Sequence, residues 1–258
     1  MKPRPIVSGH HREPLKPEER QRLEAAYFDM RQRRAGAPTA RRSVVTTDVR
    51  IKAMEFSRGN PDASRVVNSI ARFVKNTEMV DVSPRVLQHF YNAQTAHDVV
   101  TKRAVPTLMG TSSKPIIGCQ TISATMAALL RAVDPQRVKG STSDVRIVRT
   151  RTEWGRDDRG RILGMPHTLV SFKVNGRQHY ADALKGSQFL GGRAVISEAD
   201  LNPKIRQRIA QLKSQGDWRE ADDVSEFGTN TFAQFLEECH RSGADIARRP
   251  NLADFLVK

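Results

Sequence analysis

A four-residue stretch, VNGR at positions 174–177, constrains the fold more than any other part of the chain. Asn175-Gly176 separates two runs in which apolar and polar residues alternate, HTLVSFKV and RQHYADAL. Asn-Gly is the preferred pair for a two-residue hairpin turn, because both turn positions need a positive φ. The sequence therefore predicts two antiparallel strands joined at this turn, with Val174 opposite Arg177.

The register of this hairpin decides which polar residues share a face. Pairing continued from the turn places Leu169 opposite Asp182, and side chains alternate between the two faces along each strand. His167 then lies on the same face as Asp182, as a diagonal neighbour within about 7–8 Å at the backbone. His179 falls on the opposite face, and we interpret it as structural. Unless a bulge shifts the register, the hairpin predicts a carboxylate that orients the imidazole of His167.

The segment GCQTISATMAALLRAV, residues 118–133, has the pattern of a buried helix that begins at a cysteine. The apolar residues that recur at helical spacing are Ile122, Met126, Leu129, Leu130 and Val133. A helix N-terminus favours a thiolate, because its unpaired N–H groups and its dipole stabilise negative charge, and Gly118 leaves room for a substrate. Cys119 is therefore a candidate nucleophile. A cysteine that only fills a core would fit the same position equally well, so the helix alone leaves both interpretations open.

The rest of the pattern is typical of an α+β fold, in which a helix precedes antiparallel strands and further helices flank them. Helices are expected at 62–80, with Asp62 or Ser64 as cap, and at 83–105, 202–216 and 230–247; a strand is expected at 143–154, and a turn-rich connection at 155–164.

Charge and composition suggest the organisation of the chain and its partners. Residues 1–43 are rich in Arg and Pro, and we interpret them as a basic, partly flexible extension that precedes a single domain at 44–258. The whole chain has 43 Lys and Arg against 28 Asp and Glu, a net charge of +15. Such a field attracts acidic proteins or nucleic acid, and we favour a protein substrate with an acidic surface.

The sequence also bears on location. No window approaches the roughly 18 apolar residues of a membrane span, and the N-terminal segment MKPRPIVSGHHREPLKPEER has no apolar core of a secretory signal. Two cysteines, Cys119 and Cys239, do not form a disulfide framework. We expect a cytoplasmic protein, or one exported into a target cell by a route that reads no such signal. The oligomeric state is left open.

The order of these candidate residues resembles the transglutaminase-like branch of the papain-like cysteine enzymes, including effector-type deamidases and proteases. In that branch a Cys leads an apolar helix, a His opens a strand, and an Asp closes the next strand; here GCQTISATMAALLRAV and PHTLVSFKVNGRQHYADAL match this order, with 15 residues from His167 to Asp182. The resemblance covers 114–184. An aromatic residue often stands where this chain has Leu169, and a Trp where it has His179 and Tyr180, which leaves the subclass of substrate open.

The resemblance implies a papain-like or transglutaminase-like core and a catalytic triad of Cys119, His167 and Asp182. His167 would take the proton of the thiol, Asp182 would fix the imidazole, and the thiolate would attack an amide carbonyl to give a thioester. Water would then complete deamidation or proteolysis, and an amine would complete cross-linking. We expect a thiol-dependent amide hydrolase or acyltransferase, foremost a glutamine deamidase or a cysteine protease. A delivered effector or toxin is one setting in which such an enzyme would act. We expect neither metal nor cofactor.

A different class of protein is the alternative: a basic nucleic-acid-binding or scaffold protein that keeps the fold without catalysis. Its aromatic content of 6% offers no stacking platform among the basic runs, which makes nucleic acid the secondary partner. The remaining candidate residues are better explained without a role in catalysis or binding. Asn92 or Gln94 as oxyanion donor, Trp154 in the cleft, Cys239 as a second thiol and the His10-His11 pair as a metal site are each better explained by packing or by a solvated surface.

Overall fold

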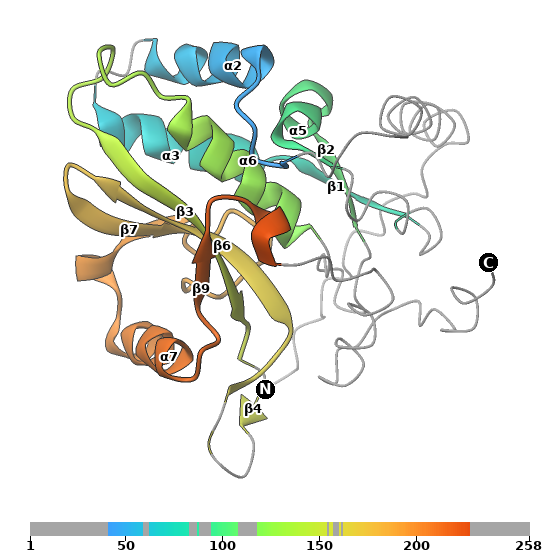
Figure 1. Ribbon diagram of the computed structural model, residues 1–258, viewed down its shortest axis with the longest axis vertical. Helices are drawn as coiled ribbons and strands as arrows, with labels where there is room; N and C mark the ends of the chain where they lie inside the picture. Colours follow the sequence, from blue (N-terminus) through green and yellow to red (C-terminus); the bar gives the residue numbers. More distant parts are fainter. Residues whose placement is uncertain are drawn as a thin grey trace, which may run out of the picture. The chain divides into compact units, whose positions relative to one another are not determined.

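The computed structural model describes residues 41–58, 62–82, 87, 94–107, 118–153, 155–156, 160 and 162–227 (Figure 1). All of them belong to the compact unit from Thr39 to Lys258. The helices are α2 (Thr47–Ser57), α3 (Ala63–Lys75), α5 (Ala96–Lys102), α6 (Cys119–Arg131) and α7 (Pro203–Ser214). The strands are β1 (Glu78–Asp81), β2 (Ala104–Thr107), β3 (Thr142–Arg151), β4 (Gly155–Arg156), β5 (Ile162–Leu163), β6 (Pro166–Val174), β7 (Arg177–Ala181), β8 (Val195–Ser197) and β9 (Arg219–Ala221). The described residues therefore form a mixed α+β structure, as predicted.

The main sheet has five strands in the order β8-β7-β6-β3-β9, and every neighbouring pair is antiparallel. Val174 pairs with Arg177 across a turn in which Asn175 has φ 51° and Gly176 has φ 75°. These angles are those of the type I′ turn that Asn-Gly favours. The predicted register is confirmed as far as Val170 and Ala181, the last pair of the ladder.

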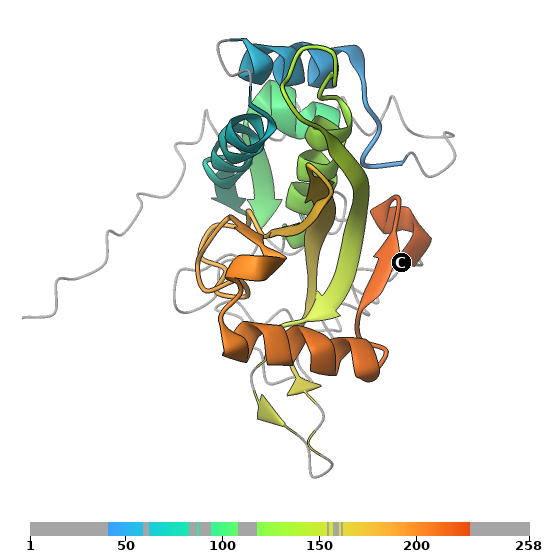
Figure 2. The same ribbon diagram turned by 90° about the vertical axis from the view of Figure 1, so that its left-hand side faces the viewer.

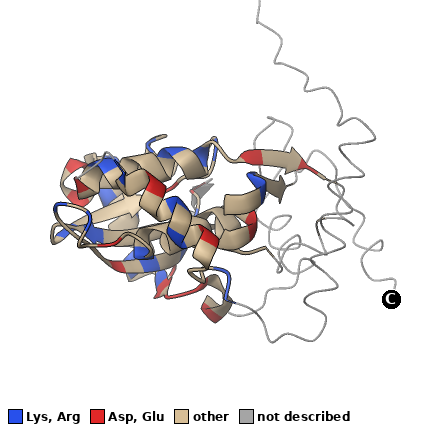
Figure 3. Cartoon of the chain, turned by 90° about the horizontal axis from the view of Figure 1, so that it is seen from above, with Lys and Arg blue, Asp and Glu red and all other residues tan. Residues whose placement is uncertain are grey.

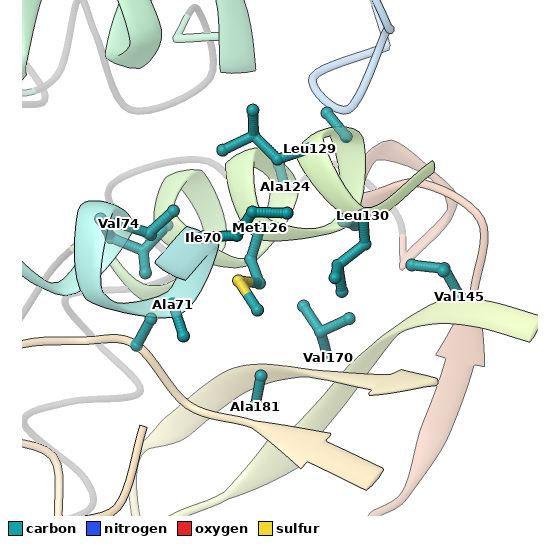
Figure 4. Packing of buried hydrophobic residues seen from close by; sticks show 14 of the residues in the cluster. Ile70, Ala71, Val74, Ala124, Met126, Leu129, Leu130, Val145, Val170 and Ala181 are labelled. Atoms are coloured by element: carbon teal, nitrogen blue, oxygen red, sulfur yellow. The ribbon is translucent and has the colours of Figure 1, made fainter. Parts of the chain in front are cut away.

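Each face of the sheet packs against different helices (Figures 1 and 2). Ile147 and Val170 belong to the larger apolar core, together with residues of α2, α3, α5 and α6, whereas Val148 and Leu169 belong to a second core with residues of α7. This division follows from the alternation of side chains along β3 and β6. In Figure 4 the side chains of Met126 and Leu130 extend from α6 toward the sheet. Helix α6 thus lies across one face with its sequence-predicted apolar positions buried.

Local sequence signals explain the helix starts. Asp62 caps α3, because its carboxylate accepts from the backbone N–H groups of Ser64 and Arg65 at 2.9 and 3.1 Å. Asn202 caps α7 in the same way, through the backbone N–H of Ile205 at 2.9 Å. The helix expected at 202–216 is confirmed, and the one expected at 62–80 is confirmed as far as Lys75, after which Glu78–Asp81 forms β1. The helix expected at 230–247 lies outside the described residues. No helix in the described ranges has the length and the apolar character needed to cross a membrane.

The helix predicted over 83–105 is confirmed at Ala96–Lys102, but it is not continuous with residues before Thr95 and does not reach 105. A new helix, α5, begins there because the buried Asp98 carboxylate accepts from Thr95 N and Thr95 Oγ1 at 2.9 and 2.8 Å. It ends at Arg103, which has φ 59°, and the chain continues as β2 parallel to β1. The connection predicted over 155–164 likewise contains the paired strands β4 and β5. Periodicity alone showed none of these short strands.

Candidate active site

Cys119 is the first residue of α6, and the backbone of Gly118 makes that start possible. Gly118 has φ 129°, and a Cβ on it would lie 2.5 Å from the terminal methyl of Met79. Its carbonyl accepts from the backbone N–H of Ile122 at 2.9 Å, which closes the first turn. The thiol therefore sits beside the unpaired N–H groups of a helix N-terminus, and the Cys119 residue is 7% exposed.

His167 and Asp182 form the pair that the hairpin register predicts. The distance from His167 Nε2 to Asp182 Oδ2 is 2.9 Å, and both side chains are buried. The carboxylate also accepts from the hydroxyl of Ser187 and, at 3.4 Å, from the backbone N–H of Leu184. Asp182 is thus held from two further directions, and a buried carboxylate with these partners can fix the ring and support its positive charge.

The ring of His167 lowers the pKa of the Cys119 thiol, and the thiol in turn raises the pKa of the ring, so the two side chains lie within reach of each other. Because Nε2 faces Asp182, Nδ1 is the ring nitrogen left for the thiol. Burial alone would raise the pKa of Cys119, but the hydrogen bond and charge of His167, with help from Thr168, lower it below its ordinary value. Burial alone would lower the pKa of His167, but Asp182 and then Cys119 raise it to about 10. Each shift favours a thiolate–imidazolium pair.

A hydrogen bond between α6 and β6 sets the position of the thiol relative to the imidazole. Ser123 Oγ, one turn along α6 from Cys119, donates to the backbone carbonyl of Thr168 at 2.9 Å, and both residues are buried. Thr168 follows His167 directly in β6. The bond therefore fixes the first turn of the helix against the part of the strand that carries the imidazole.

An aromatic ring from the segment after Asp182, that of Phe189, packs against one side of the imidazole. The Phe189 ring lies with its centroid 5.5 Å from that of His167, and its backbone N–H donates to Ser187 Oγ at 3.3 Å. The guanidinium of Arg208 in α7 lies 4.4 Å from the Phe189 centroid and donates to the Phe189 carbonyl. His167, Phe189 and Arg208 thus form a stack that limits rotation of the imidazole.

Sequence reasoning missed Ser187, Phe189 and Arg208. The structure gives the reason for the first two: β8 pairs with β7, so the segment between Asp182 and Val195 turns back toward the strand end that carries Asp182. Nothing in the sequence pointed to Arg208, because it reaches the site only through the packing of α7.

The other sequence candidates do not join this site within the described residues. His179 pairs with Phe172, stacks on its ring at 5.7 Å, and its Nδ1 bonds the carbonyl of Arg177 at 2.8 Å. Its predicted separation from Asp182 is therefore confirmed. Gln94 is buried directly before α5. Asn92, Trp154, Cys239, His10 and His11 lie outside the described residues.

The arrangement can therefore supply a nucleophile, a general base that becomes a general acid, and a carboxylate that holds the base. In the part of the chain that the structure describes, no three His, Cys, Asp or Glu side chains gather as a metal site would require. Comparison with protein-family models, with curated proteins and with solved structures gave no match.

Proposed function

We propose that the protein is a thiol-dependent amide hydrolase or acyltransferase that acts on a protein substrate through Cys119, His167 and Asp182. One observation carries this proposal: His167 and Asp182 form a buried pair at 2.9 Å, and the imidazole of this pair lowers the pKa of a thiol at the start of a helix. Buried thiols in ordinary cores have a raised pKa, whereas here the imidazole lowers it. A structural cysteine would need neither the imidazole nor the carboxylate behind it.

The chemistry follows from the roles of the three side chains. The Cys119 thiolate attacks the amide carbonyl, and the resulting oxyanion is stabilised by backbone N–H groups of the first turn of α6. The His167 imidazolium gives its proton to the leaving nitrogen, which departs as ammonia or as an amine and leaves a thioester on Cys119. Neutral His167 then takes a proton from water, whose oxygen attacks the thioester, and the acid product leaves with the thiolate restored.

The finer assignment is a transglutaminase-like or papain-like core, and its support is topological. The nucleophile comes from the first turn of a helix that packs on an antiparallel sheet, the base from the start of β6, and the carboxylate from the residue after β7. Glutamine deamidation and peptide hydrolysis are the reactions we propose first, since both need only water as the second substrate. An effector delivered into a target cell is one setting for either reaction.

Charge supports a protein substrate over nucleic acid. In the described part of the chain, Lys and Arg occur on helices, strands and loops with Asp and Glu among them (Figure 3). Nucleic-acid binding would favour a continuous basic stripe. We propose an acidic protein surface as the partner of the basic chain, whose net charge is +15.

The decisive experiment compares wild-type protein with Cys119→Ala in a cell lysate. Mass spectrometry should find glutamine deamidation, new peptide ends or isopeptide links that appear only with wild-type protein, because removal of the nucleophile abolishes thioester formation. Circular dichroism should show the same fold for both proteins. In a parallel measurement, iodoacetamide should label Cys119 much faster than Cys239. Equal, slow labelling of the two native cysteines would contradict the proposal.

A further inference from the structure

A cavity of about 270 Å³ is lined by two neighbours of His167: Pro166, which precedes it in β6, and Thr150, its partner in β3. It is formed where the end of β3, the start of β6, the loop after α7 and the start of β9 meet. The lining residues are Arg149, Thr150, Arg151, Pro166, Gly216, Asp217 and Arg219. Ligand pockets usually measure about 300–1,000 Å³, so this cavity has room for one side chain rather than for a whole small-molecule ligand.

Positive charge exceeds negative charge in the lining. Arg151 is paired with the only carboxylate among the lining residues, Asp217, at 3.0 Å between Nε and Oδ1. Arg149 donates to the backbone carbonyl of Phe227 at 3.3 Å and has no ion-pair partner in the described ranges. Arg219 is exposed and has no ion-pair partner among the residues that the structure describes. The cavity therefore holds two guanidinium groups that no described carboxylate neutralises.

These two arginines are direct partners across β3 and β9. Side chains at directly opposed positions have Cβ atoms about 4.5–5.5 Å apart, and like charges placed there destabilise the sheet. An anion between the two guanidinium groups would remove this repulsion and would accept hydrogen bonds from both. The arrangement thus costs stability when empty and favours a bound oxyanion.

The arginine pair lies in one row with Thr168, a residue that interacts with the thiol. Arg219, Arg149 and Thr168 are consecutive partners across β9, β3 and β6, so they form one row on the sheet face that α6 covers. Thr168 is the residue that helps to lower the pKa of Cys119. Strands lie about 4.8 Å apart, which places the row's two ends roughly 10 Å from each other. In the next row Thr150, which also lines the cavity, pairs with His167.

We propose that this cavity is a specificity subsite, in which Arg149 and Arg219 bind an oxyanion group of the protein substrate while Cys119 attacks an amide one or two residues away. The group is the carboxylate of an Asp or Glu side chain or the phosphate of a phosphorylated side chain. The proposal rests on the proposed function and adds what that function lacks, a reason for choosing one amide over another. It also gives the basic charge of the chain a local role at the site.

The test uses three maleimides that carry a six-carbon chain, long enough to reach from the thiol toward the arginine pair. The chain ends in a carboxylate, a phosphate ester or, as a neutral reference, a methyl ester. Labelling of Cys119 in the full-length protein is followed by peptide mass spectrometry. The carboxylate probe should react about tenfold faster than the methyl ester at low ionic strength, with the advantage lost as salt is added.

Two substitutions examine the cause. The double variant Arg149→Gln/Arg219→Gln should bring the carboxylate-to-ester ratio close to one, and each single variant should lower it in part. Arg177→Gln is the matched control, because Arg177 is exposed at the far end of the β6–β7 hairpin, and it should keep the wild-type ratio. A further gain with the phosphate probe assigns the subsite to phosphorylated residues; equal rates for the two anionic probes assign it to acidic residues.

The outcomes separate this subsite from the proposed function. Fast labelling by the methyl ester with a ratio of one in wild-type protein overturns the subsite and leaves the reactive thiol standing. A raised ratio that survives the double substitution also overturns it. If no probe labels Cys119 faster than Cys239, the proposed function fails instead. In that case binding of inorganic phosphate tests the cavity by itself. Phosphate should raise the melting temperature of wild-type protein by more than it raises that of the double variant, and equal shifts overturn the subsite.

Discussion

The two halves of the candidate site are built in different ways. His167 and Asp182 come from one hairpin, where an Asn-Gly turn fixes the register and the register fixes the pair. Cys119 comes from a helix that precedes this hairpin in sequence and is held against it by core packing and by the Ser123–Thr168 hydrogen bond. The first half depends on local geometry, and the second depends on the tertiary structure. Substitutions in the two halves should therefore have different effects on thiol reactivity and on stability.

The largest effect should come from breaking the pair within the hairpin with Asp182→Asn. Asp182 is the main group that raises the pKa of His167 to about 10, so its neutral replacement should leave the imidazole uncharged at neutral pH. The pKa of Cys119, which the imidazolium lowers, should then rise. An ordinary thiol with a pKa of about 8.5 is only about 1% ionised at pH 6.5, so labelling by iodoacetamide at that pH should fall by up to about 100-fold.

The pH dependence of Cys119 labelling shows in which direction Asp182 shifts the pKa of the thiol. The lowered pKa of Cys119 keeps the thiolate at pH values below 8.5, the ordinary range for a cysteine, and the thiolate is lost as the pH falls through that lowered value. The raised pKa of His167 keeps the imidazolium until the pH reaches about 10. Wild-type labelling should therefore have its midpoint well below that of Asp182→Asn. Identical profiles for the two proteins would show that the carboxylate does not act on the thiol.

How far the sequence predicts the site follows the same division. The spacing of a short hairpin determines which face each side chain takes, so Asn175-Gly176 was enough to pair His167 with Asp182 and to separate His179. No such rule joins Cys119 to His167, and only a resemblance suggested that contact. Periodicity also failed at Thr95, because a capping interaction with the buried Asp98 starts a new helix inside an apolar pattern.

Alanine substitution of one glycine in each half allows the stability of the two halves to be compared. Gly118→Ala places a Cβ 2.5 Å from the Met79 methyl at φ 129°, whereas Gly176→Ala meets nothing within 4 Å at φ 75°. The turn variant should lose about 1 kcal/mol of unfolding free energy through positive φ alone. The helix variant should lose about 2–3 kcal/mol, because φ 129° is a backbone conformation that other residues rarely adopt, whereas the Met79 methyl ends a flexible side chain and can move aside.

Chemical denaturation of both variants measures these losses, and thiol labelling measures their effect on the site. Only Gly118→Ala should slow the labelling of Cys119, because it displaces the start of α6. The added substitution Met79→Ala removes the overlap but should restore little of the labelling rate, because the strain lies in the backbone of Gly118. Full recovery in the double variant would show instead that the Met79 methyl, and not φ 129°, constrains the start of the helix.

The smallest expected effect concerns the residue that supports the hairpin pair from outside the hairpin. Ser187 donates to Asp182 and accepts from the backbone N–H of Phe189, so Ser187→Ala removes one of the interactions that hold the carboxylate toward His167. A hydrogen bond to a charged group contributes about 1.5–3 kcal/mol, but water and the Leu184 N–H can replace part of it. Labelling of Cys119 at pH 6.5 should fall by about three- to tenfold, well short of the loss in Asp182→Asn.

The control variant is Ser197→Ala, which removes an exposed hydroxyl bonded to Asp200 and should leave the labelling rate of Cys119 unchanged. A loss as large as that of Asp182→Asn would mean that the register of the hairpin alone does not hold the pair, and that tertiary contacts govern both halves of the site.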